Sequence, residues 1–176
     1  EMYKYLTARQ NLEQYARMRD GVTAERINEV VELVGLSNRM NEKISKYSLG
    51  MRQRLGIGMA LLAQPEIMVL DEPVNGLDPE GIVDVRNIIK NLADEKNVTV
   101  IISSHLLSEL SELCTDFTLM NNGKLIESFS AGDLLKKCKS RISLKTTDNR
   151  AVCGVLEEKL GIKDYLLEDS DEISIF

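Results

Sequence analysis

Two adjacent carboxylates, Asp71 and Glu72, follow the short apolar run Ile67 to Leu70. A continuous apolar run of this length predicts a strand buried on both faces, whose end would lie at the carboxyl edge of a parallel sheet, where α/β folds bind ligands. There Asp71 suits Mg²⁺, which prefers carboxylate and water oxygens, and Glu72 can orient or deprotonate a water molecule. An isolated Asp-Glu pair is more often a polar strand end entering a turn, so the neighbouring motifs decide.

Three neighbouring segments carry complementary chemistry. Ser48, within Tyr47-Ser48-Leu49-Gly50-Met51, stands at a predicted helix start, where unpaired N–H groups and a hydroxyl favour an anion such as phosphate. Gly76-Leu77-Asp78-Pro79 follows the carboxylates, and His105 follows the next apolar strand. Alone, Ser48 is more often a helix N-cap and His105 a hydrogen-bonded strand-end histidine. Together and in this order, they favour a phosphate-handling site.

The elements that must position these residues can be read from capping and periodicity. Thr7 to Gln10 has the form of a capping box, Thr23 can cap a second helix that ends at Gly35, and Asp78-Pro79 opens a fourth helix. Strands with helices between them indicate βαβ units and a parallel sheet, hence the α/β class. The predicted order is helix 8–19, helix 24–34, helix 48–64, strand 67–70, helix 79–93, strand 98–102 and helix 105–114.

The remaining chain reads as a hairpin followed by a small appended unit. Asn121-Asn122-Gly123 separates two apolar runs and predicts a hairpin, and a short helix starts at Ser130. A strand, a helix and two strands are then expected over 142–145, 150–160, 165–167 and 173–176. We therefore predict a helical subdomain over 1–46, a catalytic α/β core over 47–139, and a small α+β extension over 140–176.

Composition excludes several classes of protein. The 176 residues carry 22 Lys plus Arg against 28 Asp plus Glu, a net charge of −6, which argues against a bare nucleic-acid binder. Hydrophobic residues make up 43%, which makes intrinsic disorder unlikely for this chain. No apolar run approaches the roughly 18 residues of a membrane span. The three cysteines, Cys114, Cys138 and Cys153, have no metal-ligand spacing and are expected to be small buried residues.

With these motifs in place, the chain resembles the nucleotide-binding domain of ATP-binding cassette (ABC) ATPases over roughly residues 3–135. Its Ser-Leu-Gly-Met-Arg-Gln-Arg form most resembles the ATPases of bacitracin and lantibiotic resistance exporters. The resemblance implies the C-terminal part of a P-loop NTPase fold, with parallel strands and a helical subdomain. It also implies ATP and Mg²⁺ as cofactors.

The resemblance assigns roles residue by residue. Asp71 corresponds to the aspartate that supports Mg²⁺, Glu72 to the catalytic glutamate that polarises the attacking water, and His105 to the switch histidine. Gly76-Leu77-Asp78 matches the D-loop, which runs along the dimer interface. Tyr47 to Met51 matches the signature motif, which contacts nucleotide from the partner subunit through Ser48, Leu49, Gly50 and Met51; the nucleotide-binding set also includes Asp78.

The sequence departs from the family pattern in two places, the signature motif and the phosphate-binding P-loop. Leu49 and Met51 stand where the family usually has Gly and Gln, so one expected side-chain contact is missing while Ser48 and Gly50 remain. No G-x-x-x-x-G-K-[ST] pattern occurs, so the chain has no P-loop. We therefore expect a C-terminal part of a longer protein that is inactive by itself.

For the complete protein, the resemblance implies an ATPase that couples ATP binding and hydrolysis to the export of a peptide antibiotic or similar amphiphile. Its expected partners are a transmembrane permease, met through the helical segment 7–39, and a second copy in a head-to-tail dimer, with no nucleic acid. The expected location is the cytoplasm, on the inner face of the membrane. A soluble ABC machine of translation or DNA repair and a non-catalytic regulatory module are the alternatives.

Overall fold

Side-chain caps set the start of the first helices. In the computed structural model, which describes residues 2–137, 142–169 and 172–175, helix α1 (Ala8–Arg17) begins after Thr7. Thr7 and Gln10 form the predicted capping box. Helix α2 (Ala24–Leu33) is capped by the Thr23 side chain, which accepts from the Arg26 backbone N–H. These two helix predictions are confirmed, with α1 ending two residues earlier than expected.

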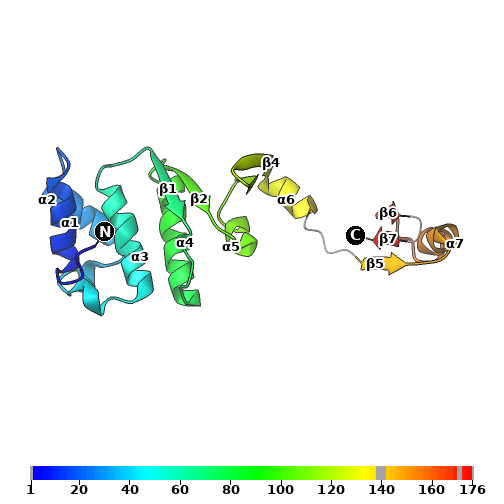
Figure 1. The fold of residues 1–176 in the computed structure, drawn as a ribbon, viewed down its shortest axis with the longest axis horizontal. Coiled ribbons are helices and arrows are strands. Elements are labelled where there is room, and N and C mark those ends of the chain that lie inside the picture. The colour runs from blue at the N-terminus through cyan, green and yellow to red at the C-terminus, as the bar shows by residue number, and fades with distance from the viewer. Residues whose placement is uncertain (1, 138–141, 170–171, 176) are drawn as a thin grey trace. The chain divides into compact units, whose positions relative to one another are not determined.

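A third helix packs against the first two. Gly35 adopts a φ of +64° directly after α2, as a helix-ending glycine does. Two 3₁₀ turns, η1 (Ser37–Arg39) and η2 (Ile44–Lys46), lead to helix α3 (Leu49–Leu61), which contacts α1, α2 and α4. Figure 1 shows these helices gathered at the N-terminal end of the chain. Their buried apolar faces form a large part of the core.

A βαβ unit follows and carries the predicted carboxylates. Strand β1 (Ile67–Asp71) leads to helix α4 (Pro79–Asp94) and then to strand β2 (Thr99–Ser103). The two strands pair in parallel, with Asp71 opposite Ser103 at the carboxyl edge. The predicted α/β fold with parallel strands is confirmed (Figure 1).

The two-stranded sheet is buried on one face only. Met68 is buried and Leu70, Val100 and Ile102 pack against the core. On the opposite face, Ile67, Val69 and Ile101 are 61%, 71% and 55% exposed. The prediction that the β1 strand is buried on both faces is therefore wrong, because the described elements cover only the face that carries the even-numbered residues.

Helix α5 (Leu107–Ser111) is shorter than the predicted helix over 105–114. His105 lies outside it, between the end of β2 and the helix. Its N-cap residue, Leu106, offers no side-chain acceptor for the first backbone N–H groups. The Leu106 N–H instead donates to Ser104 Oγ at 3.1 Å, a local turn that places His105 before the helix, so the predicted start at 105 is wrong by two residues.

Contacts divide the chain into two units, Glu1–Leu113 and Cys114–Phe176. The second unit opens with the predicted hairpin, β3 (Asp116–Asn121) and β4 (Lys124–Ser130). Asn122 and Gly123 turn it with φ values of +49° and +72°, as a tight Asn-Gly turn requires. Helix α6 (Ala131–Lys137) follows.

The second unit ends in a three-stranded antiparallel sheet of order β5-β7-β6. Ile173 of this sheet and Leu156 of the adjoining helical segment are buried. The predicted α+β character of this region is confirmed, whereas the three-part division at 46/47 and 139/140 stays a prediction. The elements of this region are β5 (Ile142–Lys145), α7 (Asn149–Gly154), the π-helix η3 (Val155–Lys159), β6 (Tyr165–Asp169) and β7 (Glu172–Ile175).

Two of the three cysteines can be placed. Cys114 and Cys153 form no disulfide among the described residues and are half-buried, and Cys138 lies outside the described residues.

None of the helices among the described residues combines the length and the apolar character that a membrane crossing requires.

Candidate active site

The ends of β1 and β2 are tied together by their own polar groups. The Ser103 hydroxyl donates a short hydrogen bond to Asp71 Oδ1. The Glu72 backbone N–H donates to the Ser103 carbonyl oxygen at 3.0 Å and lies 3.2 Å from its hydroxyl. Asp71 is exposed at this edge. The parallel register thus fixes Asp71 and Glu72 at one point of the sheet.

Glu72 and His105 meet at this edge. His105 Nδ1 lies 2.8 Å from Glu72 Oε1, and the two side chains are 61% and 32% exposed. The second carboxylate oxygen, Oε2, is buried without a hydrogen-bond partner among the described residues. Glu72 has a φ of +46°, a left-handed conformation that is uncommon and costly for a residue with a side chain. The His105 contact and the backbone conformation therefore hold the Glu72 carboxylate in one orientation at the sheet edge.

Ser48 caps helix α3. Its hydroxyl accepts from the Met51 backbone N–H at 3.2 Å, and Ser48 and Leu49 are both exposed. Directly before it, Tyr47 is buried and its hydroxyl donates to the Arg39 carbonyl at 2.8 Å. Burial of this hydroxyl raises the pKa of Tyr47. The buried tyrosine therefore anchors the start of α3, while the next residues face outward.

The start of α3 lies beside the loop that opens α4. A Cβ placed on Gly50 would lie 3.8 Å from the Gly81 Cα, and one on Gly76 would lie 3.4 Å from Leu49 Cδ2. Gly76 has a φ of +73°. Asp78 caps α4 by accepting from the Gly81 N–H at 3.1 Å. The predicted signature and D-loop segments are thus neighbours within one chain.

The predicted site residues form two groups. Asp71, Glu72 and His105 gather at the sheet edge, while Ser48 to Met51 lie beside the segment around Asp78. Among residues 2–137, no hydrogen bond or ion pair joins Ser48 to Glu72 or His105. The role of each residue in binding or catalysis stays a prediction.

Ser103 also belongs to this site, although no role was predicted for it from the sequence. Its hydroxyl contacts both Asp71 and the Glu72 backbone. Aligning the two apolar strands in parallel would have found it, because that alignment places Ser103 opposite Asp71. A second residue, Arg86, has no sequence signal and is described below.

The donor set at the sheet edge fits a Mg²⁺ ion. Asp71 offers a carboxylate and Ser103 a hydroxyl, both hard oxygen donors. No group of three His, Cys, Asp or Glu side chains gathers within the part of the chain that the structure describes. These donors suit an ion that is held through one carboxylate, water and substrate phosphates, as Mg²⁺ commonly is.

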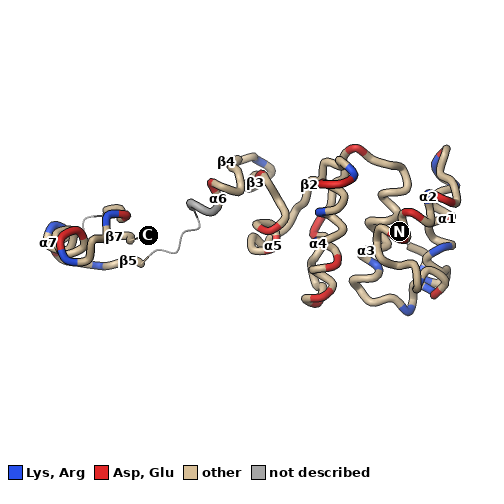
Figure 2. The backbone as a smooth tube through the Cα atoms, turned by 180° about the vertical axis from the view of Figure 1, so that it is seen from behind, with Lys and Arg blue, Asp and Glu red and all other residues tan. Residues whose placement is uncertain are grey.

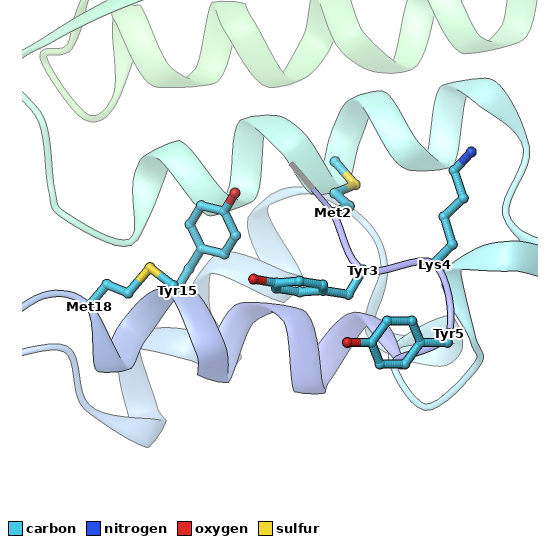
Figure 3. A pocket seen from close by; sticks show the side chains of 6 residues that line it. All are labelled: Met2, Tyr3, Lys4, Tyr5, Tyr15 and Met18. Atoms are coloured by element: carbon cyan, nitrogen blue, oxygen red, sulfur yellow. The ribbon is translucent and has the colours of Figure 1, made fainter.

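A separate pocket of about 400 Å³ lies at the N-terminal end of the chain. Figure 3 shows Tyr3 and Tyr15 on either side of it, with Tyr5 and Met18 at its borders. Tyr5 and Met18 are 69% and 67% exposed. It contains none of the predicted catalytic residues.

Known proteins match the chain in sequence. The ABC transporter family profile matches residues 2–75. The uncharacterized ABC transporter ATP-binding protein YhcH of Bacillus subtilis is 53% identical over 127 residues, which are 72% of this chain and 42% of that protein. The bacitracin transport ATP-binding protein BcrA of Bacillus licheniformis is 39% identical over 174 residues, 99% of this chain and 57% of that protein. The chain belongs to the ABC transporter ATP-binding family.

Solved structures of this family share the fold. CbiO1 of Clostridium perfringens, part of the ABC transporter complex CbiONQ, superposes with a TM-score of 0.69 and 18% identity, over 92% of this chain and 60% of that one. A dimeric ATP-binding cassette bound to ADP and phosphate superposes with a TM-score of 0.64 and 22% identity, over 74% and 59%. The predicted P-loop NTPase fold is confirmed. The chain spans about half the length of the curated relatives that it matches.

Proposed function

We propose that the protein is the ATP-binding subunit of an ABC exporter and that it couples ATP binding and hydrolysis to the export of a peptide antibiotic or similar amphiphile. The observation that carries this proposal is the contact between Glu72 and His105 beside Asp71 at the edge of the parallel strands. The relationship to a bacitracin transport protein supports the substrate class. The chain contains no P-loop sequence. In the tests that follow, the complete ATPase means this chain joined to a segment that carries a P-loop.

The geometry supports a division of labour at the sheet edge. The Glu72 carboxylate accepts a proton from the attacking water, and His105 Nδ1 contacts the same carboxylate and helps to orient it. Asp71 would hold Mg²⁺ at the same edge, and the Ser103 hydroxyl keeps the Asp71 carboxylate in place. The metal, when bound, neutralises charge on the phosphate oxygens. His105 is 61% exposed, so its second ring nitrogen can contact phosphate while Nδ1 stays on Glu72.

The position of the signature residues supports a composite site shared by two copies. Ser48 and Leu49 are exposed at the start of α3, and no hydrogen bond or ion pair among residues 2–137 links them to the carboxylate group. In a head-to-tail dimer, the helix N-terminus of one copy faces the nucleotide that is held by the other, where its N–H groups favour phosphate. The solved cassette of the same fold that binds ADP and phosphate is dimeric, which supports a pairing of two copies.

The aromatic pocket supports contact with a membrane permease. Tyr3, Tyr5, Tyr15 and Met18 line an open pocket formed by α1 and the segment before it, together with Met2 and Lys4 (Figure 3). Large exposed aromatic and methionine side chains are typical of protein–protein contacts. Docking here would hold the subunit on the inner face of the membrane through its permease.

Substitution of Ser48 tests the proposal. In the complete ATPase, Ser48→Arg places bulk and charge where the partner's nucleotide docks, so each subunit should still bind ATP while dimer closure and hydrolysis fail. Thr23→Arg is the control, because it removes the equivalent cap of α2 far from the proposed interface. The readouts are ATP hydrolysis and gel filtration in ATP. Normal turnover by Ser48→Arg would overturn the composite site.

A further inference from the structure

Helix α5 has little stability of its own. It has five residues, none of them buried, and Leu106 provides no side-chain cap. Helices this short are marginal in water, because nucleation costs more than a few hydrogen bonds return. Its position must therefore depend on contacts with other elements.

Arg86 of α4 supplies two of those contacts. Its Nη2 donates to Glu109 Oε2 at 2.6 Å, and its Nη1 makes a short hydrogen bond to Glu112 Oε2. Figure 2 shows the acidic residues on α5. The Arg86 side chain is 18% exposed and Glu109 is 22% exposed, whereas Glu112 is 59% exposed. The Glu109 contact is therefore the shielded one, and a guanidinium fork that is held at two of its nitrogens is fixed in both position and orientation.

Helix α5 begins two residues after His105. Ser104 Oγ accepts from the Leu106 N–H at 3.1 Å, so the intervening backbone is itself held. His105 in turn contacts Glu72 at 2.8 Å. A shift of α5 would therefore move His105 relative to the Glu72 carboxylate.

We propose that Arg86 is a positioning residue that fixes His105 against Glu72 by anchoring α5 to α4. This inference rests on the proposed ATPase function. Helix α4 starts at Asp78 of the D-loop segment, so the same fork links that segment to His105. Among the described residues, no hydrogen bond or ion pair joins Arg86 to the sheet-edge carboxylates or to the start of α3.

A second ion pair between an arginine and a carboxylate, which also involves α4, provides the matched control. Arg54 of α3 contacts Asp84 of α4 at 3.2 Å, and Arg54 is also 18% exposed. Removing this pair removes a comparable contact from α4 and leaves α5 untouched. Asp84→Asn is therefore the control for a general loss of stability.

Steady-state kinetics of the complete ATPase form the first arm of the test. Arg86→Gln should lower kcat about tenfold and leave KM for Mg-ATP unchanged, because small displacements of catalytic groups are costly. Glu109→Gln should have the same direction of effect, and Asp84→Asn should leave kcat unchanged. In a His105→Ala background, Arg86→Gln should cause no further loss. A full additional loss there, or equal losses for Asp84→Asn and Arg86→Gln, would overturn the proposal.

The second arm does not depend on ATP hydrolysis. His105 is the single histidine of the 176 residues, so the chain gives one imidazole signal by NMR. Arg86→Gln should shift or broaden that signal, and Asp84→Asn should not. An unchanged signal in Arg86→Gln would overturn the positioning role. A complete ATPase without activity, with the expected NMR change, would instead overturn the proposed function.

Discussion

At the residue scale, Glu72 adopts a backbone conformation that its surroundings must maintain. Left-handed backbone costs roughly 1–2 kcal/mol for a residue with a side chain, and Glu72 has a φ of +46°. The Ser103 carbonyl and the His105 ring hold it there. The sequence predicted the neighbourhood of Asp71, Glu72 and His105, but it contains no signal for this conformation, which depends on the pairing of two distant strands.

Tyr47 gives a residue-scale prediction on pH. Because burial raises the pKa of Tyr47, the neutral hydroxyl is favoured in the folded state. Its contribution to the free energy of unfolding is complete below the unfolded pKa of about 10 and is lost as pH rises through the folded pKa. Tyr47→Phe should cost about 1 kcal/mol at pH 7, because the Arg39 carbonyl loses its donor, and should reduce the loss of stability above pH 10.

Urea denaturation at pH 7 and in the alkaline range measures both effects. Tyr5→Phe is the control, because Tyr5 is 69% exposed. A Tyr47→Phe variant as stable as the parent at pH 7 would contradict a structural role for this hydroxyl.

At the element scale, the close approach of α2 and α3 depends on Gly58. A Cβ at this position would lie 3.2 Å from Val30 Cγ1 and 3.5 Å from both Val34 methyls. At Gly56, the nearest atom is the flexible end of Met2, at 3.3 Å. Gly56-Ile57-Gly58 is therefore explained by helix packing.

We expect Gly58→Leu to destabilise the chain by about 1–3 kcal/mol, because overpacking forces the two helices apart. Gly56→Leu should cost clearly less, because Met2 can move aside. Denaturant midpoints of the two variants at a common slope measure the difference. Equal costs at the two positions would show that the Val30 and Val34 contacts do not limit the packing.

The elements also show how far sequence reasoning reaches. Caps at Thr7, Thr23 and Asp78 predicted three helix starts correctly, because capping is local chemistry. Exposure of Val69 could not be predicted, because an apolar strand does not reveal which of its faces is covered. Arg86 was missed because its partners lie more than twenty residues away in sequence and the pairing follows no periodicity.

At the scale of the whole molecule, the exposed face of the β1–β2 sheet is the main apolar surface of the first unit that the core leaves uncovered. Ile67, Val69 and Ile101 form it, with Val69 opposite Ile101. Exposed apolar sheet faces promote association. The 176-residue chain should therefore self-associate in solution.

Light scattering across a concentration series measures this association. Val69→Lys should lower the mean mass, and Val83→Lys, a change at an exposed valine on α4, should not. A strictly monomeric parent chain would contradict the expectation.

The central claim is that Glu72 acts as the base that activates water. In the complete ATPase, Glu72→Gln keeps size and shape but removes the charge, so single-turnover hydrolysis should fall by about 10²–10⁴. Mg-ATP binding should be nearly unchanged, because Asp71 remains, and gel filtration in ATP should show a persistent closed dimer. Asp71→Asn should instead weaken Mg-ATP retention. Single-turnover hydrolysis by Glu72→Gln at the parent rate would contradict the claim.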